Sequence, residues 1–379
     1  MSVQPSGPVR PRRFGKLPPT GPLLAQRPHG QRSNQVFEPL PFPTGTYPYR
    51  LDLVDVVPGA AEALSGDRPL VFHCVGDTGG IKDPAPQLAV AAAMEADLRA
   101  PAGQPPVFLY HLGDVVYFAG ERSEYYPQFY EPYADYPIPV FAIPGNHDGS
   151  VAPGSLDPSL AGFVENFCAT DPHLTPEAEE VDRHAMTQPN VYWTLVTPRV
   201  TIIGLYTNVP EGGRILNDQA AWLQQELAAA HPDLPVIVTL HHPVYSLDSV
   251  HGGDPDLQRV LDAAFAGAQR VPDAVLNGHV HNYQRFVRDH DGRQVPYIVA
   301  GAGGYHNLHR VGHGPNGQPA PPQPEAVTLA SHCDDRYGFL RVTVTKEAIQ
   351  GEYVAVPRTG AVTRDFDRWT LDLTSHRVT

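Results

Sequence analysis

Polar side chains of the kinds that bind metal ions recur along the chain, each set directly after an apolar segment. They carry carboxylate, phenol, amide and imidazole groups, at Asp77, Asp114, Tyr117, Asn146, His147, His241, His279 and His281. These are hard to borderline ligands, and none of them is a thiolate. A single divalent ion takes about four to six ligands, so this set is large enough for two ions that share one bridging carboxylate.

Such a pair of ions would suit the hydrolysis of phosphate esters. Two cations about 3.5–4 Å apart can clamp the attacking and leaving oxygens of an in-line phosphoryl displacement, and they lower the pKa of a shared water so that hydroxide exists near neutral pH. Each motif by itself also fits a structural turn: Gly-Asp pairs are common after strands, and Asn146-His147-Asp148 could be an Asx turn. The recurrence of five such motifs, each after an apolar strand, favours the metal site.

The segments that precede the motifs are apolar and short, which predicts buried strands. We expect strands over residues 70–75, 106–112, 139–143, 191–196, 200–206, 235–240 and 274–276, with further strands near 338–345, 350–355 and 368–373. Helices are expected over 86–99, around 159–168, over 218–230 with Asn217 as its N-cap, and over 255–266. This order predicts an α/β fold with two facing mixed sheets and helices outside. Ligands usually bind at the carboxyl ends of such strands, where every polar motif falls.

Composition sets the limits of this domain and excludes several classes of protein. The Pro- and Arg-rich segment 1–46 is expected to form an arm with little regular structure, and 47–379 the catalytic domain. The net charge of −14 argues against nucleic-acid binding, and no apolar run is long enough for a membrane span. Three cysteines are too few and too scattered for a disulfide scaffold or a cysteine zinc site. Arg12-Arg13 is not followed by an apolar signal segment, which favours a cytoplasmic protein, with export as the alternative.

The motifs also match a known family in their order. Gly76-Asp77-Thr78-Gly79, Gly113-Asp114-Val115-Val116-Tyr117, Gly145-Asn146-His147-Asp148, Val238-Thr239-Leu240-His241 and Gly278-His279-Val280-His281 resemble the motifs of calcineurin-like metallophosphoesterases. Within that superfamily the chain resembles the purple acid phosphatase branch. The broad superfamily usually has Asp-x-His in the first block, whereas this chain has Thr78 and Gly79 after Asp77 and carries Tyr117 in the second block, as the branch does. The resemblance runs from about residue 70 to 305 and implies a four-layer α/β/β/α sandwich.

The resemblance implies a role for each matching residue. Asp77, Tyr117 and His281 would hold one metal, expected to be Fe(III). Asn146, His241 and His279 would hold the second, expected to be Fe(II), Zn or Mn. Asp114 would bridge the two ions, and His147 would contact the phosphate and assist the leaving group.

Residues that would contact the substrate are less clearly specified by the sequence. His251 is predicted as a catalytic phosphate contact, and His242, next to the expected ligand His241, is a second candidate. Tyr305 and His306 either line the same rim or form a tight turn. Arg285 either neutralises phosphate or forms a structural ion pair.

The sequence therefore predicts a dinuclear phosphomonoesterase, similar to the purple acid phosphatases, that uses a metal-bound hydroxide on a small phosphate ester. A phosphodiesterase or phospholipid-directed enzyme of the same fold is one alternative. A non-catalytic binding protein that uses its Pro-rich arm is another.

Overall fold

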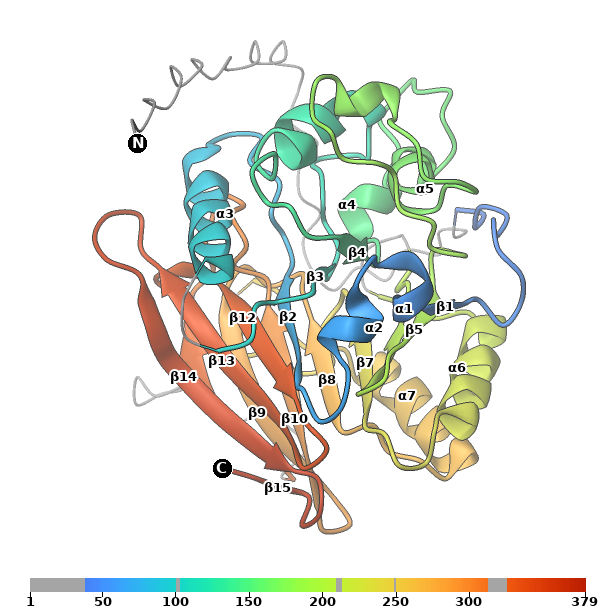
Figure 1. Ribbon diagram of the computed structural model, residues 1–379, viewed down its shortest axis with the longest axis vertical. Helices are drawn as coiled ribbons and strands as arrows, with labels where there is room; N and C mark the ends of the chain where they lie inside the picture. Colours follow the sequence, from blue (N-terminus) through green and yellow to red (C-terminus); the bar gives the residue numbers. More distant parts are fainter. Residues whose placement is uncertain (1–37, 100–102, 209–212, 249, 313–325) are drawn as a thin grey trace, which may run out of the picture. The chain divides into compact units, whose positions relative to one another are not determined.

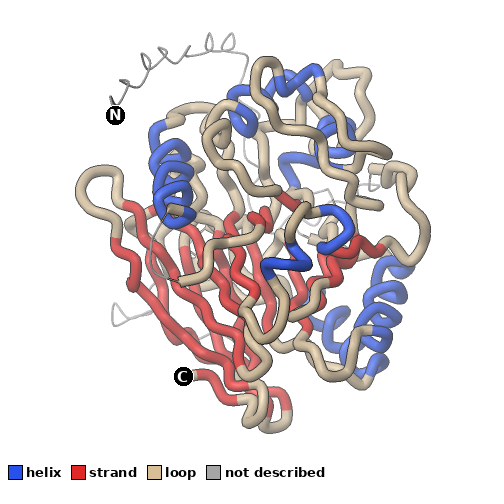
Figure 2. Tube along the Cα trace, in the orientation of Figure 1, coloured by secondary structure: helices blue, strands red, loops and turns tan. Residues whose placement is uncertain are grey.

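The computed structural model describes residues 38–99, 103–208, 213–248, 250–312 and 326–379, and it contains two mixed β-sheets (Figures 1 and 2). One sheet has seven strands. Their order across the sheet is β15 (Arg377–Val378), β14 (Thr363–Asp372), β13 (Ala348–Val356), β12 (Tyr337–Val344), β2 (Leu70–Val75), β3 (Phe108–His111) and β4 (Val140–Ala142). Strands β2, β3 and β4 are parallel, so their carboxyl ends meet at one edge of the sheet.

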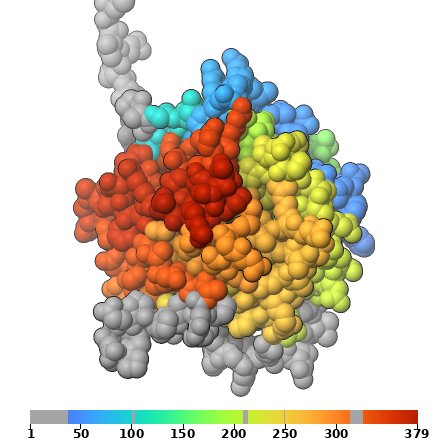
Figure 3. Space-filling model, turned by 90° about the horizontal axis from the view of Figure 1, so that it is seen from below, coloured from blue at the N-terminus to red at the C-terminus, as the bar shows by residue number. Residues whose placement is uncertain are grey.

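The second sheet has eight strands and also contains a parallel set. Its order is β1 (Arg50–Asp52), β5 (Trp193–Val196), β6 (Thr201–Gly204), β7 (Val236–Leu240), β8 (Ala274–Asn277), β10 (Arg293–Ala300), β9 (Tyr283–His290) and β11 (Val327–Cys333). Strands β6, β7, β8 and β10 run parallel to one another. Figure 3 shows the C-terminal strands, in red, beside the orange segments of this sheet on one face.

Three apolar cores hold four layers together. Alternate residues of β2 (Leu70, Phe72 and Cys74) point into the core between the sheets, which also receives Ile237 of β7 and Ile298 of β10. A second core packs α3 (Ala85–Leu98) and α5 (Ala161–Phe167) on the seven-stranded sheet. A third packs α6 (Asn217–Ala229) and α7 (Pro255–Ala268) on the eight-stranded sheet. The expected sandwich of two facing sheets flanked by helices is therefore confirmed.

Short helical turns fill the connections between these layers. They are α1 (Leu53–Val56), α2 (Ala60–Ala63), α4 (Asn146–Gly149), 3₁₀ turns at Arg122–Glu124 and Pro176–Ala178, and a π-helical turn at Tyr126–Tyr130. Helix α7 begins after Asp254, whose carboxylate accepts the N–H groups of Asp256 and Leu257 at 2.8 and 3.0 Å. The prediction that Asn217 caps α6 is wrong, because Leu216 takes the extended N-cap conformation and Asn217 is already the first helical residue.

The main elements that the sequence analysis missed are β1, α1, α2 and the strands β9, β10 and β11. Strands β9 and β10 form a hairpin through Asp291 and Gly292, which have φ angles of 52° and 89°. An Asp-Gly pair between two strands is the usual signature of such a tight turn, so this signal was present in the sequence.

The proposed division into an arm and a domain at residues 46 and 47 stays a prediction. Residues 1–37 lie outside the described part of the chain, as does nearly all of the Pro-rich loop expected over 312–324. Among the described residues of the expected arm, the N–H groups of Thr44 and Gly45 donate to the carbonyl of Pro189 at 3.1 and 2.9 Å. In the described part of the chain, no helix has the length and apolar character that crossing a membrane requires.

Candidate metal centre

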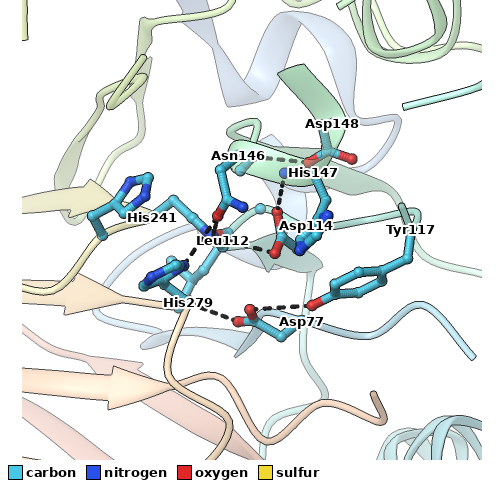
Figure 4. A network of polar contacts seen from close by, with 12 residues as sticks. Asp77, Leu112, Asp114, Tyr117, Asn146, His147, Asp148, His241 and His279 are labelled. Carbon is cyan, nitrogen blue, oxygen red and sulfur yellow. Dashed lines mark hydrogen bonds and ion pairs between the residues drawn. The ribbon is translucent and has the colours of Figure 1, made fainter. Parts of the chain in front are cut away.

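The predicted ligands come from the carboxyl ends of strands in both sheets and converge between them (Figure 4). The seven-stranded sheet supplies Asp77 after β2, Asp114 and Tyr117 after β3, and Asn146 after β4; the eight-stranded sheet supplies His241 after β7, and His279 and His281 after β8. Backbone hydrogen bonds join the loops: the N–H of Asp77 donates to Gly113 at 3.0 Å, and the N–H of Gly278 donates to His241 at 3.0 Å. The two sheets themselves are tied at this edge by the N–H of Gly76, which donates to Ala300 at 2.9 Å.

Three of the predicted ligands have an uncommon backbone conformation. The φ angles of Asp77, Asp114 and His279 are 59°, 54° and 68°, in the left-handed region that residues other than glycine seldom occupy. Such strain is typical of sites where the surrounding structure fixes a functional side chain. Gly145 is required for space, since a Cβ there would overlap the carboxylate of Asp114.

One group of donor atoms forms around Asp77. The hydroxyl of Tyr117 lies 3.4 Å from Asp77 Oδ1 and 3.4 Å from His281 Nε2, and His281 Nε2 lies 3.6 Å from Asp77 Oδ1. The other carboxylate oxygen of Asp77 accepts the N–H of His279 at 2.8 Å. These three side chains are the ones that the resemblance assigns to the first metal.

A second group forms around Asn146. Its amide oxygen lies 3.0 Å from His241 Nε2 and 3.0 Å from His279 Nδ1. Asp114 is close to this group, with Oδ2 3.4 Å from His241 Nε2 and Oδ1 accepting the N–H of His147 at 2.9 Å. Suitable ligand atoms of Asp114, His241 and His279 all lie within 4.8 Å of one another, close enough to hold one ion.

The orientation of two imidazoles fits cation binding. Nδ1 of His241 is 2.8 Å from the carbonyl of Leu112, and Nδ1 of His281 is 3.0 Å from the carbonyl of Asn307. A carbonyl only accepts, so each Nδ1 carries the proton, and in the neutral ring Nε2 presents a lone pair. Those lone pairs face the oxygens of Asp114 and Asp77, an arrangement that a shared cation would stabilise. Ligand histidines in metalloproteins usually make such a bond through the second ring nitrogen.

The protonation preferences of these groups also indicate a need for positive charge. Burial raises the pKa of Asp77 to about 8, and the nearby Asp114 adds to the rise. Burial would raise the pKa of Asp114 as well, but His147 and the positive charge that His241 carries while no cation is bound hold it below its usual value; a bound cation would take the place of the Nε2 proton of His241. Burial, followed by the two carboxylates, raises the pKa of the Tyr117 phenol well above its ordinary value. Two cations would stabilise the ionised forms of all three groups, so the donor set fits a dinuclear centre.

His147 lies at the same centre, and Asp148 joins the loops that surround it. Nδ1 of His147 is 2.8 Å from the carbonyl of Phe118, and its ring packs on Tyr117 with centroids 4.4 Å apart. The buried carboxylate of Asp148 accepts the N–H groups of Val115 and Gly145 at 3.1 and 2.8 Å. It therefore links the loop that carries Asp114 to the loop that carries Asn146.

His251 and His242 flank the centre on the side of the eight-stranded sheet. The ring of His251 lies 4.6 Å from that of His279, and the ring of His242 lies 4.4 Å from it. Nδ1 of His242 is 2.6 Å from Thr207 Oγ1. Both residues are thus near the second group of donors.

The sequence analysis missed Asp248 and His309, which pair beside His251. Nδ1 of His309 lies 3.2 Å from Asp248 Oδ2, while Asp248 Oδ1 accepts the N–H of His251 at 2.7 Å. The ring of His309 packs on His281 and His251, with centroids 4.5 and 5.1 Å apart. No spacing rule connects residues 248 and 309, so only the fold brings them together.

Of the remaining candidates, Tyr305 lies at the rim of the centre and Arg285 belongs to the supporting structure. Tyr305 is buried, and its ring stacks on Tyr117 with centroids 4.2 Å apart, so it belongs to the rim as well as to a turn. Arg285 makes a two-point contact with Asp367, Nε to Oδ2 at 2.7 Å and Nη2 to Oδ1 at 2.9 Å. This contact supports the structural ion pair over the phosphate contact.

Comparison with known proteins gives the same picture. Residues 70–283, more than half of the chain, match the family model of the calcineurin-like phosphoesterases. Human tartrate-resistant acid phosphatase type 5 is 28% identical over 274 residues, which cover 67% of this chain and 77% of that protein. Purple acid phosphatase 22 of Arabidopsis thaliana is 32% identical over 123 residues, 30% of this chain and 27% of that protein.

Solved structures support the fold. The purple acid phosphatase PPD1 from yellow lupin seeds superposes with a TM-score of 0.59 at 17% identity, covering 82% of this chain and 55% of that one. GAP50, described as the anchor in the inner membrane complex of Plasmodium, superposes with a TM-score of 0.54 at 16% identity, covering 78% of this chain and 88% of that one. From the matched motifs and the shared architecture, this chain belongs to the calcineurin-like phosphoesterase family, and its relatives include purple acid phosphatases.

Proposed function

We propose that the chain is a phosphomonoesterase of the purple acid phosphatase type, with a dinuclear centre of Fe(III) paired with Fe(II), Zn or Mn. The observation that carries the proposal is the presence of two donor groups in one centre, one with a phenol and one with an amide oxygen, together with Asp114, which lies 3.4 Å from His241 of one group and interacts with Tyr117 of the other. When bound, the two cations would supply Lewis acidity toward the phosphate and an activated water.

The first donor group is suited to a trivalent ion. A phenolate and a carboxylate are hard, charged ligands, and Tyr117 and Asp77 provide both beside His281. The second group, Asn146 with two imidazoles, carries less charge and suits a divalent ion. Asp114 lies between the groups and would contribute an oxygen to each.

The other residues of the centre would orient the substrate and its leaving group. Because the carbonyl of Phe118 fixes Nδ1 of His147, Nε2 remains available for a phosphate oxygen or for the leaving-group oxygen. His251 would make a second contact from the opposite side, next to His279. The buried, stacked rings of Tyr117 and Tyr305 would exclude water from this side of the site.

The proposal is tested by hydrolysis of p-nitrophenyl phosphate together with metal analysis of the purified chain. We expect turnover that requires two transition-metal ions per chain and is lost in Asp114→Asn and His281→Ala. A diester such as bis(p-nitrophenyl) phosphate, assayed in parallel, tests the phosphodiesterase alternative. A folded chain that binds both metals and hydrolyses neither ester would contradict the proposal. A cytoplasmic location and the lack of nucleic-acid binding remain predictions from the sequence.

A further inference from the structure

The side chain of Asp248 is fully buried beside the candidate metal centre and takes no part in the proposed metal or phosphate contacts. Burial of an ionised carboxylate is costly unless several donors satisfy it, so the groups that contact Asp248 identify what it holds in place. Its contacts come from three segments that are far apart in the sequence, those that carry His251, Asn282 and His309.

One oxygen of Asp248 fixes the loop that carries His251. Oδ1 accepts the N–H of His251 at 2.7 Å and also accepts the N–H of Val250. The hydroxyl of Ser246 closes the same turn, since it donates to the carbonyl of His251 at 2.8 Å and accepts the N–H of Asp248 at 3.1 Å. The backbone of His251 is therefore held at both its N–H and its carbonyl.

The other oxygen of Asp248 lies against a second imidazole, that of His309. Nδ1 of His309 is 3.2 Å from Oδ2, and the side-chain amide of Asn282 donates to the same oxygen at 3.3 Å. Burial would raise the pKa of Asp248, but the contact and the charge of His309 hold it below its ordinary value. One ionised carboxylate thus connects two imidazoles from different loops.

The ring of His309 packs on imidazoles that belong to both sides of the centre. Its centroid lies 4.5 Å from that of His281, in the first donor group, and 5.1 Å from that of His251, whose ring adjoins His279 of the second group. The N–H of His309 donates to the carbonyl of His281 at 3.0 Å, so its backbone is fixed as well. With Nδ1 at Asp248, Nε2 is the nitrogen left for a ligand, and within the described part of the chain no residue hydrogen-bonds to it.

We propose that His309 is a further catalytic residue, a second imidazole that contacts the phosphoryl group beside His251, and that Asp248 is the positioning residue for both. The inference rests on the proposed function, because the phosphate must occupy the metal centre. A protonated imidazole donates from both ring nitrogens, here Nδ1 to Asp248 and Nε2 to a phosphate oxygen. His309 takes no part in the bond changes; it holds the phosphoryl group in place while they occur.

The first test is orthophosphate binding to the metal-loaded enzyme, measured by calorimetry. His309→Asn keeps a donor near the position of Nδ1 for Asp248 but removes Nε2, whereas His309→Gln places a donor near the position of Nε2. We expect His309→Asn to bind orthophosphate about tenfold more weakly and His309→Gln to recover part of that loss, because the variants differ in a hydrogen bond to a charged group. The control is His231→Asn, at an exposed residue before β7 and at the opposite end of that strand from His241, and it should leave the affinity unchanged.

Kinetics separate a substrate contact from a structural role. In His309→Asn the KM for p-nitrophenyl phosphate should rise about tenfold while kcat changes by less than about twofold, since the contact forms in the ground state and in the transition state alike. Asp248→Asn keeps an oxygen for the N–H of His251 but loses the charge beside His309, so KM should rise in that variant too. The double variant should be no weaker than the weaker single variant, because both changes remove the same contact.

The outcomes distinguish this inference from the proposed function. Unchanged orthophosphate affinity in His309→Asn would overturn the inference, and so would loss of a metal ion from that variant, because His309 would then support His281 instead of the substrate. Additive effects of the two substitutions would overturn the positioning role of Asp248. A wild-type enzyme that binds orthophosphate at its metals but hydrolyses no phosphate ester would overturn the proposed function alone, since the binding comparison still decides the role of His309.

Discussion

His73, in the strand that leads to Asp77, is expected to limit the stability of the protein at acidic pH. Its side chain is fully buried between the seven-stranded sheet and α3, with Nε2 2.9 Å from Asp97 Oδ2 and Nδ1 2.8 Å from the hydroxyl of Tyr136. Burial, together with the charges of Arg341 and Arg364, holds the pKa of His73 well below its ordinary value. The imidazole is therefore neutral in the folded protein.

The sign and size of the effect follow from proton linkage. In the unfolded chain the imidazole of His73 has a pKa of about 6.5. Below that pH it is protonated in the unfolded state but stays neutral in the folded state. The contribution of His73 is fully present above about pH 6.5 and is lost as the pH falls. Between about pH 7.5 and about pH 5.0 one such group lowers the free energy of unfolding by about 2 kcal/mol.

The matched variant is His73→Gln, which can still donate to Asp97 but does not titrate. It should be about 1 kcal/mol less stable than the wild type at about pH 7.5, because the bond to Tyr136 is lost. By about pH 5.0 the order should reverse, since the variant escapes the acid penalty of about 2 kcal/mol. Urea unfolding followed by tryptophan fluorescence at several pH values measures this, with the exposed His184→Gln as control. If wild type and His73→Gln lose stability in parallel between these pH values, the assignment of a neutral buried His73 is wrong.

Three further predictions concern the metal centre and its scaffold. In Gly145→Ala the new methyl group would collide with the carboxylate of Asp114, so the metal content should fall and kcat should drop about a hundredfold. A variant that binds its metals fully and turns over normally would show that the close contact of Gly145 with Asp114 is not required. Tyr117→Phe should abolish the visible absorption of an iron–phenolate pair while the far-ultraviolet circular dichroism stays the same, and a band that persists would rule out Tyr117 as its source. Arg285→Met should lower the free energy of unfolding by about 3 kcal/mol, because it leaves the Asp367 carboxylate without its partner, and it should leave KM unchanged. Unchanged stability together with a raised KM would show instead that Arg285 contacts the phosphate.

Much of the centre could be predicted because its ligands lie at positions that sequence patterns mark. Asp77, Asp114 and Asn146 each follow an apolar strand within a few residues, and His241 and His279 do the same in the other sheet. Parallel strands bring their carboxyl ends to one edge, so the strand pattern and the polar residue after it together predict convergence. Buried strands also explain why Cys74 packs in the core between the sheets as an apolar residue.

The features that were missed depend on contacts between distant segments. The Asp248–His309 pair and the contact of Lys82 with Phe118 join loops whose spacing in the sequence carries no periodic signal. The predicted N-cap of α6 was wrong for a local reason. Asn217 has the propensity of an N-cap, but the N-cap position is taken by Leu216, one residue earlier. The β9–β10 hairpin was the exception, because its Asp291-Gly292 turn could have been recognised from the sequence.

The most direct test of the account is the metal-to-protein ratio of the purified full chain after loading with iron and zinc, measured by elemental analysis on the wild type and on Asp114→Asn. The account predicts two ions bound per wild-type chain and a clear loss in the variant, since Asp114 contacts His241 of one donor group and interacts with Tyr117 of the other. A correctly folded wild-type chain that binds one ion or none, or an Asp114→Asn variant that keeps both, would contradict the dinuclear centre.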